Sequence, residues 1–217
     1  MKKLILGIAV MSSAVAFAQT TPTTTSNSSM GMSDVRFGIK AGMNVSSITD
    51  DAGLEDQGSR IGFNAGVFAT IPVAESFSIQ PEVLYSQYGD KYDDVILGTR
   101  YSYQRKLDYI AVPVMFQYNF VPNFYLEAGP EFGFLVSAKN KLKNETNNNT
   151  INESDNYKDS LNTFNFGIGI GAGYYFTDNI GITARYVAGI SDLAKDRPDN
   201  QDAIRNNVFQ VGLAYKF

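Results

Sequence analysis

From Val35 to the C-terminus, apolar residues alternate with polar or small ones along most of the chain. This period of two indicates β-strands with one apolar and one polar face. The pattern is clearest at residues 165–174, where Phe166, Ile168 and Ile170 share one face and four glycines share the other. The chain is therefore predicted to be all-β. The eight alternating segments are residues 35–44, 61–71, 77–88, 104–118, 125–137, 165–174, 180–189 and 209–217.

The connections between these segments alternate in length. Strands of about 10 residues can cross a bilayer at a tilt, and outer-membrane barrels have short periplasmic turns and long external loops. The sequence therefore predicts an eight-stranded antiparallel up-and-down transmembrane β-barrel with both termini on the periplasmic side. The short connections are residues 72–76, 119–123 and 177–179, and the long, polar ones are residues 45–60, 89–103, 138–163 and 191–206.

A soluble eight-stranded barrel of the lipocalin kind is the main alternative, because its strands alternate too. It would turn the apolar face inward and leave the glycine-rich face as a bare outer surface. In a narrow lumen, the same glycines leave room for Arg, Lys and Glu side chains from other strands, which favours the membrane barrel. Aromatic residues near the predicted strand ends, including Tyr88 and Tyr175, are expected to form girdles at the membrane interfaces.

The N-terminus has the pattern of a targeting signal. Lys2 and Lys3 precede an apolar run that closes with the small-residue pattern Ala16-Phe17-Ala18. A membrane anchor helix is the alternative, but a run of about 14 residues is short of the roughly 20 that span a bilayer. We expect residues 1–18 to be a cleaved signal peptide, residues 19–33 a disordered Thr/Ser-rich arm and residues 34–217 the barrel.

Missing residue types limit the chemistry that is available. The chain has no Cys and no His, which excludes disulfides, thiolate nucleophiles and His-based catalysis. We expect no enzymatic activity, no catalytic residues, no cofactor and no metal centre. Whether the acidic segments 49–56 and 192–202 bind calcium stays open. The formal net charge of −4 would become −6 without Lys2 and Lys3, so nucleic acid is not an expected partner.

Four short motifs resemble a known family. They are Ser-Ile-Gln-Pro-Glu-Val-Leu-Tyr-Ser-Gln-Tyr-Gly at 78–89, Leu-Asp-Tyr-Ile-Ala-Val-Pro at 107–113, Leu-Glu-Ala-Gly-Pro-Glu-Phe-Gly at 126–133 and Gly-Leu-Ala-Tyr-Lys-Phe at 212–217. Together they resemble the Bacteroidota-type outer-membrane β-barrels, labelled PorT-like or porin family, which are similar in architecture to the OmpA transmembrane domain. The resemblance covers residues 35–217. It implies location in the outer membrane of a Gram-negative bacterium.

The same resemblance implies insertion by the barrel-assembly machinery, so that machinery and outer-membrane lipid are the implied partners. One branch of the family also implies an accessory role in protein secretion. The C-terminal assembly signal of the family matches Phe209, Val211, Leu213, Tyr215 and Phe217.

Charged residues on the predicted inward face are candidates for a site in the lumen. Lys40, Glu82 and Arg185 fall about halfway along their strands, and Glu127 and Glu131 bracket that depth. We therefore expect these five residues to form one network across the lumen. Pro81, Pro113 and Pro130 could introduce bulges, and the inward face of segment 104–118 therefore stays open. The candidates are the cations Arg36, Lys40, Arg185 and Lys216 and the anions Glu82, Glu127 and Glu131.

Two functions fit a barrel with such a lumen. Charged side chains could fill it and close it, leaving a structural or surface-interaction protein whose long external loops bind a surface ligand. Alternatively, rearranged ion pairs could open a path for small solutes, as in a channel of the porin kind. The sequence leaves both open.

Overall fold

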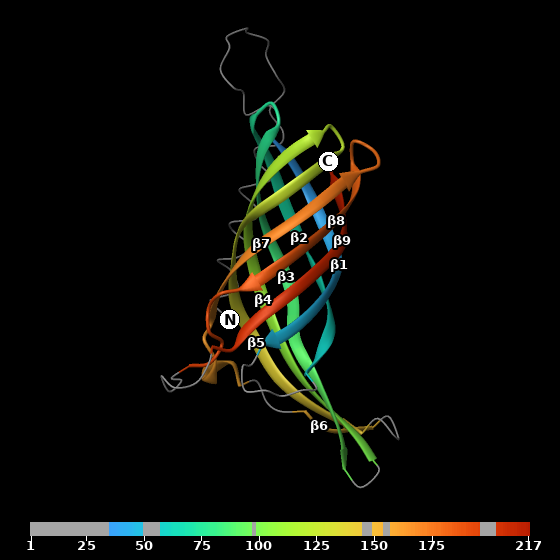
Figure 1. Cartoon of the computed structure of the whole chain (residues 1–217), viewed down its shortest axis with the longest axis vertical. Coiled ribbons are helices and arrows are strands. Elements are labelled where there is room, and N and C mark those ends of the chain that lie inside the picture. The colour runs from blue at the N-terminus through green and yellow to red at the C-terminus, as the bar shows by residue number, and fades with distance from the viewer. Residues whose placement is uncertain (1–34, 50–56, 97–98, 145–148, 154–156, 196–202) are drawn as a thin grey trace, which may run out of the picture. The chain divides into compact units, whose positions relative to one another are not determined.

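A computed structural model describes residues 35–49, 57–96, 99–144, 149–153, 157–195 and 203–217 (Figure 1). The predicted signal peptide and N-terminal arm lie outside the described residues. So do residues 50–56 and 196–202, which hold most of the acidic positions considered for calcium. In the described part of the chain, no helix has the length and apolar character needed to cross a membrane.

Nine strands and one three-residue 3-10 helix make up the described secondary structure. Eight of the strands have 10 to 23 residues, and the ninth, β6, has only five. The elements are β1 (Arg36–Thr49), β2 (Gln57–Ala74), β3 (Phe77–Ile96), β4 (Thr99–Val121), β5 (Phe124–Asn144), β6 (Asn149–Glu153), η3 (Lys158–Ser160), β7 (Phe164–Tyr175), β8 (Ile180–Gly189) and β9 (Arg205–Lys216).

The eight long strands close into a ring in which every neighbouring pair is antiparallel. β1 pairs with both β2 and β9, and the sheet continues in chain order through β4, β5, β7 and β8 back to β9. β6 lies outside the ring and pairs only with the far end of β5. The predicted eight-stranded antiparallel barrel is confirmed.

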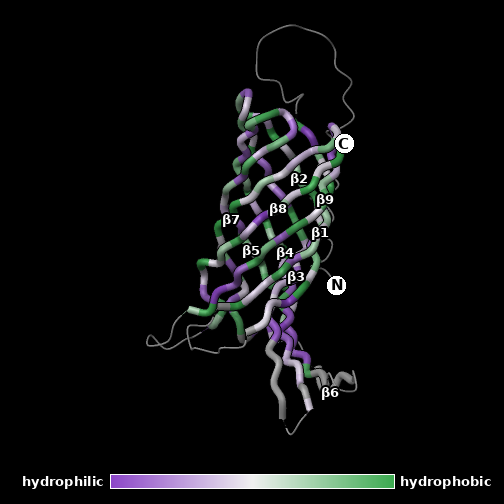
Figure 2. The backbone as a smooth tube through the Cα atoms, turned by 45° about the vertical axis from the view of Figure 1, so that its right-hand side comes forward, coloured by the Kyte–Doolittle hydropathy of each residue, from purple (hydrophilic) through white to green (hydrophobic). Residues whose placement is uncertain are grey.

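The two ends of the barrel differ. Turns at residues 75–76 and 122–123 and the bend at 176–179 form one end, which we call the turn end. The opposite, loop end carries the longer connections, and there the β3–β4 hairpin and the end of β5 extend past the other strands (Figure 1). This extension is largely hydrophilic (Figure 2).

The long connections predicted at 89–103 and 138–163 were partly wrong. Strand β3 continues to Ile96 and β4 begins at Thr99, and the two pair over the whole hairpin. β5 likewise runs to Asn144. Outside the lipid-facing part of the barrel, both faces of a strand can be polar, so the sequence there shows no alternation. The strand still forms, because pairing with its neighbour satisfies the hydrogen bonds of its peptide groups.

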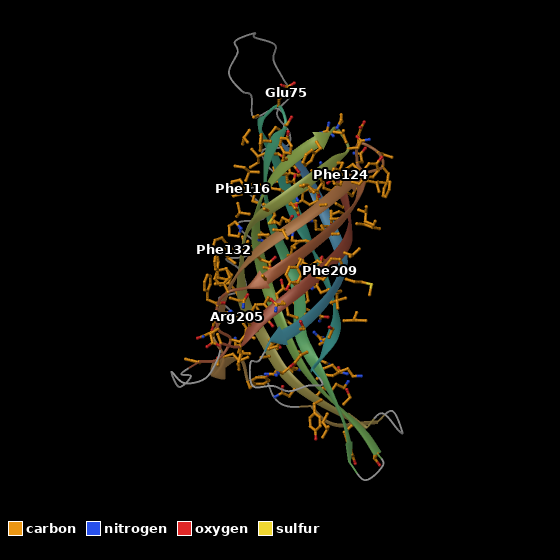
Figure 3. The ribbon with its side chains drawn as sticks, in the orientation of Figure 1. Glu75, Phe116, Phe124, Phe132, Arg205 and Phe209 are labelled. Carbon is orange, nitrogen blue, oxygen red and sulfur yellow. The ribbon has the colours of Figure 1, made fainter. Side chains whose placement is uncertain are left out.

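The outer wall of the barrel is apolar. Ile39, Ile170 and Leu213 are each at least half exposed, and such residues recur on every strand of the ring. Figure 3 shows outward side chains on the wall, with Phe116 and Phe209 labelled. On β4, Tyr109, Ala111 and Met115 are fully buried, while Phe116 is exposed. The odd-numbered residues of that segment therefore face inward, which settles the face that the sequence left open.

Candidate functional site in the barrel lumen

Four charged side chains from four strands meet inside the barrel. Lys40 of β1 donates from Nζ to Glu82 Oε1 of β3 at 2.8 Å. Arg185 of β8 donates from Nη2 to the same oxygen at 2.7 Å and from Nη1 to Glu82 Oε2 at 3.1 Å. Its Nε reaches Glu127 Oε1 of β5 at 2.7 Å. We call these four residues the lumen ion network.

Neutral side chains complete the network. Gln80 donates from Nε2 to Glu82 Oε1 at 2.7 Å and accepts from the Thr70 hydroxyl at 3.0 Å. Gln117 donates to the second oxygen of Glu127 at 3.1 Å. The two carboxylates of the network therefore accept hydrogen bonds at all four of their oxygens.

The network is buried and its formal charge is balanced, with two cations and two anions. No member has more than 6% of its surface exposed. Moving a charged group out of water costs several kcal/mol in order of magnitude. An oppositely charged partner close by, with additional hydrogen bonds, offsets that free energy. Because Arg185 bridges both carboxylates, it is the member on which the arrangement most depends.

The other three candidates take different positions. Glu131 is buried, but it accepts from the Tyr88 hydroxyl at 2.5 Å and joins none of the four charges by a described hydrogen bond. Lys216 lies over the Tyr175 ring, 3.7 Å from its centroid, as a cation–π contact. Arg36 is exposed at the turn end of β1. The structure therefore joins four of the five residues expected in one network, all but Glu131.

These contacts also correct the aromatic girdle. Tyr88 and Tyr175 were expected at the membrane interface, yet both are buried in the lumen, at 1% and 6% exposure. Tyr88 packs against Tyr109 with ring centroids 5.2 Å apart. A tyrosine near a strand end can point to either side of the wall, and its position along the strand does not decide which.

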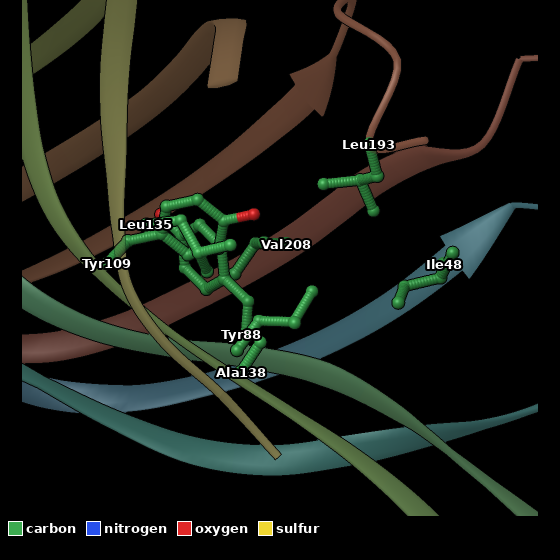
Figure 4. Packing of buried hydrophobic residues seen from close by; sticks show 8 residues of the cluster. Ile48, Tyr88, Tyr109, Leu135, Ala138, Leu193 and Val208 are labelled. Atoms are coloured by element: carbon green, nitrogen blue, oxygen red, sulfur yellow. The ribbon is translucent and has the colours of Figure 1, made fainter. Parts of the chain in front are cut away.

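An apolar cluster fills the lumen at the loop end. Its buried side chains come from the strands and from the β8–β9 connection. Figure 4 shows most of them grouped together, with Ile48 and Leu193 to one side. Tyr157, Leu161 and Ile204 pack against it from the loops. We call it the upper cluster: Ile48, Tyr88, Leu107, Tyr109, Leu135, Ala138, Leu193 and Val208.

A smaller apolar cluster fills the turn end. Phe68, Tyr125, Tyr175 and Ala214 are buried together, with the Tyr125 and Tyr175 rings 6.1 Å apart. We call it the lower cluster. The charged side chains that were expected to fill the lumen therefore occupy its middle part, and the ion network lies between two apolar layers. The strand alternation placed the apolar residues outside and did not reveal those that face inward.

Two connections are tied together over the upper cluster. Asn162 donates to the carbonyl oxygens of Asp192 and Ala194, both at 2.9 Å. Asp192 Oδ1 accepts from the backbone N–H groups of Ala194 and Ile204, at 3.0 and 3.1 Å. Residues 157–163 and 191–195, with Ile204, thus form a lid on the loop end.

The sequence showed some of the network partners but not others. Gln80 lies two residues before Glu82, so the period of two places both side chains on one face. Gln117 had no such signal, since the face of its segment was open.

Within the described residues, no group of three or more His, Cys, Asp or Glu could hold a metal ion.

Comparison with protein families identifies the chain. Residues 17–195 match the family described as outer membrane protein beta-barrel domain. The chain belongs to this outer-membrane β-barrel family. As a member, the barrel protein resides in the outer membrane of a Gram-negative bacterium. The loop end is then the external side, because the long loops of such barrels are extracellular. No sequence among the curated proteins matches.

Solved outer-membrane proteins resemble the barrel protein at low identity. Ail, the attachment invasion locus protein of Yersinia pestis, is 14% identical, with 84% of this chain and 98% of that chain covered and a TM-score of 0.47. Neisserial surface protein A is 14% identical, with 83% and 97% covered and a TM-score of 0.46. The outer membrane protease OmpT from Escherichia coli is 10% identical, with 84% and 96% covered and a TM-score of 0.37. Values of this size do not indicate a shared function.

Proposed function

We propose that the barrel protein is a closed, non-enzymatic barrel that acts as a structural or surface-interaction protein through its external side. The observation that carries this proposal is the filling of the lumen by three layers: the upper cluster, the lumen ion network and the lower cluster. An eight-stranded barrel is just wide enough for side chains to fill. Buried apolar layers above and below a neutralised ion network leave ions no hydrated path.

The external side supports an interaction role. The β3–β4 hairpin, the end of β5 and β6 form a small sheet beyond the barrel wall. Such a sheet holds its loops in place while presenting them to the outside. The surface ligand is part of the proposal, as is the Bacteroidota PorT-like type, which rests on the four motifs. Insertion by the barrel-assembly machinery, into outer-membrane lipid, rests on that same resemblance.

A small-solute channel is the second candidate, and one observation favours it. Glu131 Oε2, Asn165 Nδ2 and Asn206 Oδ1 are buried polar atoms without a hydrogen-bond partner among the described residues. Buried polar atoms are normally satisfied, and ordered water is a common partner. Hydration at the level of Glu131 would start a polar path through the upper half of the lumen.

Conductance separates the two candidates. The refolded protein is inserted into planar bilayers, and current steps are recorded for the parent, Glu82→Ala and Arg185→Ala. The closed barrel gives no steps above background in the parent. A conducting porin inserted into the same bilayers serves as the positive control for detecting current steps. Steady conductance of the parent that changes in Glu82→Ala and Arg185→Ala would replace the closed barrel with the channel.

The interaction role has its own experiment. Replacing residues 145–156 by a Gly/Ser linker removes β6 but leaves β5 and the lid side chains in place, since Ala138 and Leu161 belong to the upper cluster and its lid. We expect adhesion of whole cells to a surface or to a second cell to fall, with the amount of folded barrel unchanged. Equal adhesion of cells that carry the parent protein and cells that carry the linker variant would contradict a role for this sheet.

A further inference from the structure

Glu131 is a buried carboxylate outside the lumen ion network. It is 4% exposed, and its carboxylate has one hydrogen-bond partner among the described residues, the Tyr88 hydroxyl, 2.5 Å from Oε1. Its second oxygen, Oε2, has none. Hydroxyl donors lie about 2.5–2.7 Å from an ionised oxygen, so the distance to Tyr88 is that of a carboxylate which carries its charge.

No cation of the lumen balances this charge. The two cations of the lumen ion network are paired with its own two carboxylates, and the described residues form no ion pair with Glu131. Lys216, the other buried cation that faces inward, lies over Tyr175 in the lower cluster. A buried charge without a partner is strongly unfavourable. A positive charge from solution is therefore needed beside Oε2 of Glu131.

A second buried oxygen without a partner lies in the same row of the barrel. Glu131 of β5 is opposite Gly167 of β7, which is opposite Gly189 of β8. Gly189 in turn lies against the backbone of Asn206 of β9. Asn206 is 2% exposed, and its Oδ1 has no partner in the described part of the chain. Neither glycine places a side chain between Glu131 and Asn206, and glycine in a strand often marks the close approach of a ligand.

Two tyrosine hydroxyls bring further oxygens to this level. The Tyr88 hydroxyl contacts Glu131, and the Tyr109 hydroxyl accepts from Asn206 Nδ2 at 3.4 Å. The two rings pack against each other with centroids 5.2 Å apart. The carboxylate, the amide oxygen and the two hydroxyls are thus linked by direct contacts. We call Glu131, Asn206, Tyr88 and Tyr109 the upper oxygen site.

The chemistry of these atoms selects the ligand. Hard cations prefer oxygen ligands, and a single carboxylate balances one positive charge where a divalent ion needs two. We infer that the upper oxygen site holds a monovalent metal ion, Na⁺ or K⁺, together with bound water. The water supplies an acceptor for Nδ2 of Asn165, a donor that is buried without a partner in the described residues. The ion ties β5 to β9 in the loop-end half of the lumen.

The experiment measures how the stability of the full protein depends on the ion. The protein is refolded in neutral-detergent micelles at each salt composition, because the lid and the upper cluster cover the site, and urea unfolding is followed by tyrosine fluorescence. NaCl or KCl replaces N-methyl-D-glucamine chloride, whose cation is too large to bind, at constant ionic strength. An ion that binds only the folded barrel lowers the equilibrium constant of unfolding by about tenfold for each tenfold rise above its dissociation constant. We expect this dependence on Na⁺ or on K⁺ in the parent.

Three variants locate the ion. Glu131→Gln keeps the shape of the side chain but removes its charge, and it should abolish the dependence. Asn206→Leu removes one oxygen ligand and should shift the dependence to higher ion concentrations. Glu75→Gln removes the same charge at an exposed position of the turn end, and it should respond as the parent does.

A parent that is equally stable in all three salts would overturn the inference, because Glu131 would then hold a proton or water alone. The same dependence in Glu131→Gln as in the parent would place the ion elsewhere and overturn it too. If Glu131→Gln does not refold, Asn206→Leu decides, and an unchanged dependence in that variant would overturn the inference. Each outcome is independent of whether the lumen conducts.

Discussion

Arg185 and Glu82 meet across the lumen through two hydrogen bonds, of 2.7 and 3.1 Å, although 103 residues separate them along the chain. The contact joins β8 to β3, which are not neighbours in the ring. It ties opposite parts of the wall together in a way that strand pairing does not. The guanidinium also holds Glu127, so one side chain organises both carboxylates.

Replacing Arg185 by methionine should destabilise the barrel by about 3–5 kcal/mol, because the buried carboxylate of Glu127 loses its cation and that of Glu82 keeps only Lys40. Urea unfolding in detergent, followed by gel mobility, measures the free energy of unfolding. Adding Glu127→Gln to Arg185→Met should recover much of the loss, since Lys40 and Glu82 then remain as a balanced pair. Arg205→Met, at an exposed position, is the control. A double variant that is less stable than the single variant would contradict the charge-balance argument.

Asp192→Ala should loosen the lid without unfolding the barrel. Its Oδ1 accepts from the N–H groups of Ala194 and Ile204, and losing an acceptor costs about 1–3 kcal/mol. Hydrogen exchange at those two amides should rise by about tenfold or more, while exchange in β4 stays slow. Asp159→Ala, at an exposed position of η3 within the same lid, provides the comparison. Unchanged exchange at both amides would show that other contacts hold the lid.

Arginine on the outer wall should have a cost that depends on depth. Ile170 is 60% exposed in the middle of β7, where arginine is expected to cost about 2–4 kcal/mol in a bilayer. Ile190 lies past the end of β8 at the loop end, and the same substitution there should cost about 0–1 kcal/mol. Equilibrium unfolding from lipid vesicles measures both values. Equal costs at the two positions would contradict the assigned lipid-facing band.

Phe217→Ala should reduce assembly in cells and leave refolding in detergent almost unchanged. The predicted assembly signal consists of four alternate residues of β9 and of Phe217 directly after it, all exposed, with Phe217 at 68%. Phe176→Ala changes a second exposed aromatic residue at the turn end, at 60%, and should assemble normally. The fraction of heat-modifiable barrel in the membrane is the measurement. Equal assembly of the two variants would mean that the terminal residue is not part of a signal.

The outward residues could be predicted from alternation on the strands outside segment 104–118, and the lumen only in part. Lys40, Glu82, Glu127 and Arg185 fell on a polar face, so their meeting followed from strand alternation and closure. The partner of Glu131 did not follow, because Tyr88 was assigned to a membrane interface. Leu107 was likewise missed as a lumen residue, because the face of its segment was open. Leu135 lies on the same odd-numbered face as Glu127 and Glu131, but the prediction there concerned the charged residues.

Local sequence determined the strands, their outward faces and the ring that they form. Contact with lipid requires an apolar outward face on each strand. Each of the eight strands supplies its share of that surface from one continuous segment of the sequence. Tertiary structure alone decided what fills the inside, because each lumen contact joins strands from across the ring. The pairing of Arg185 with Glu82, the two apolar layers and the lid depend on register and closure, to which the whole chain contributes.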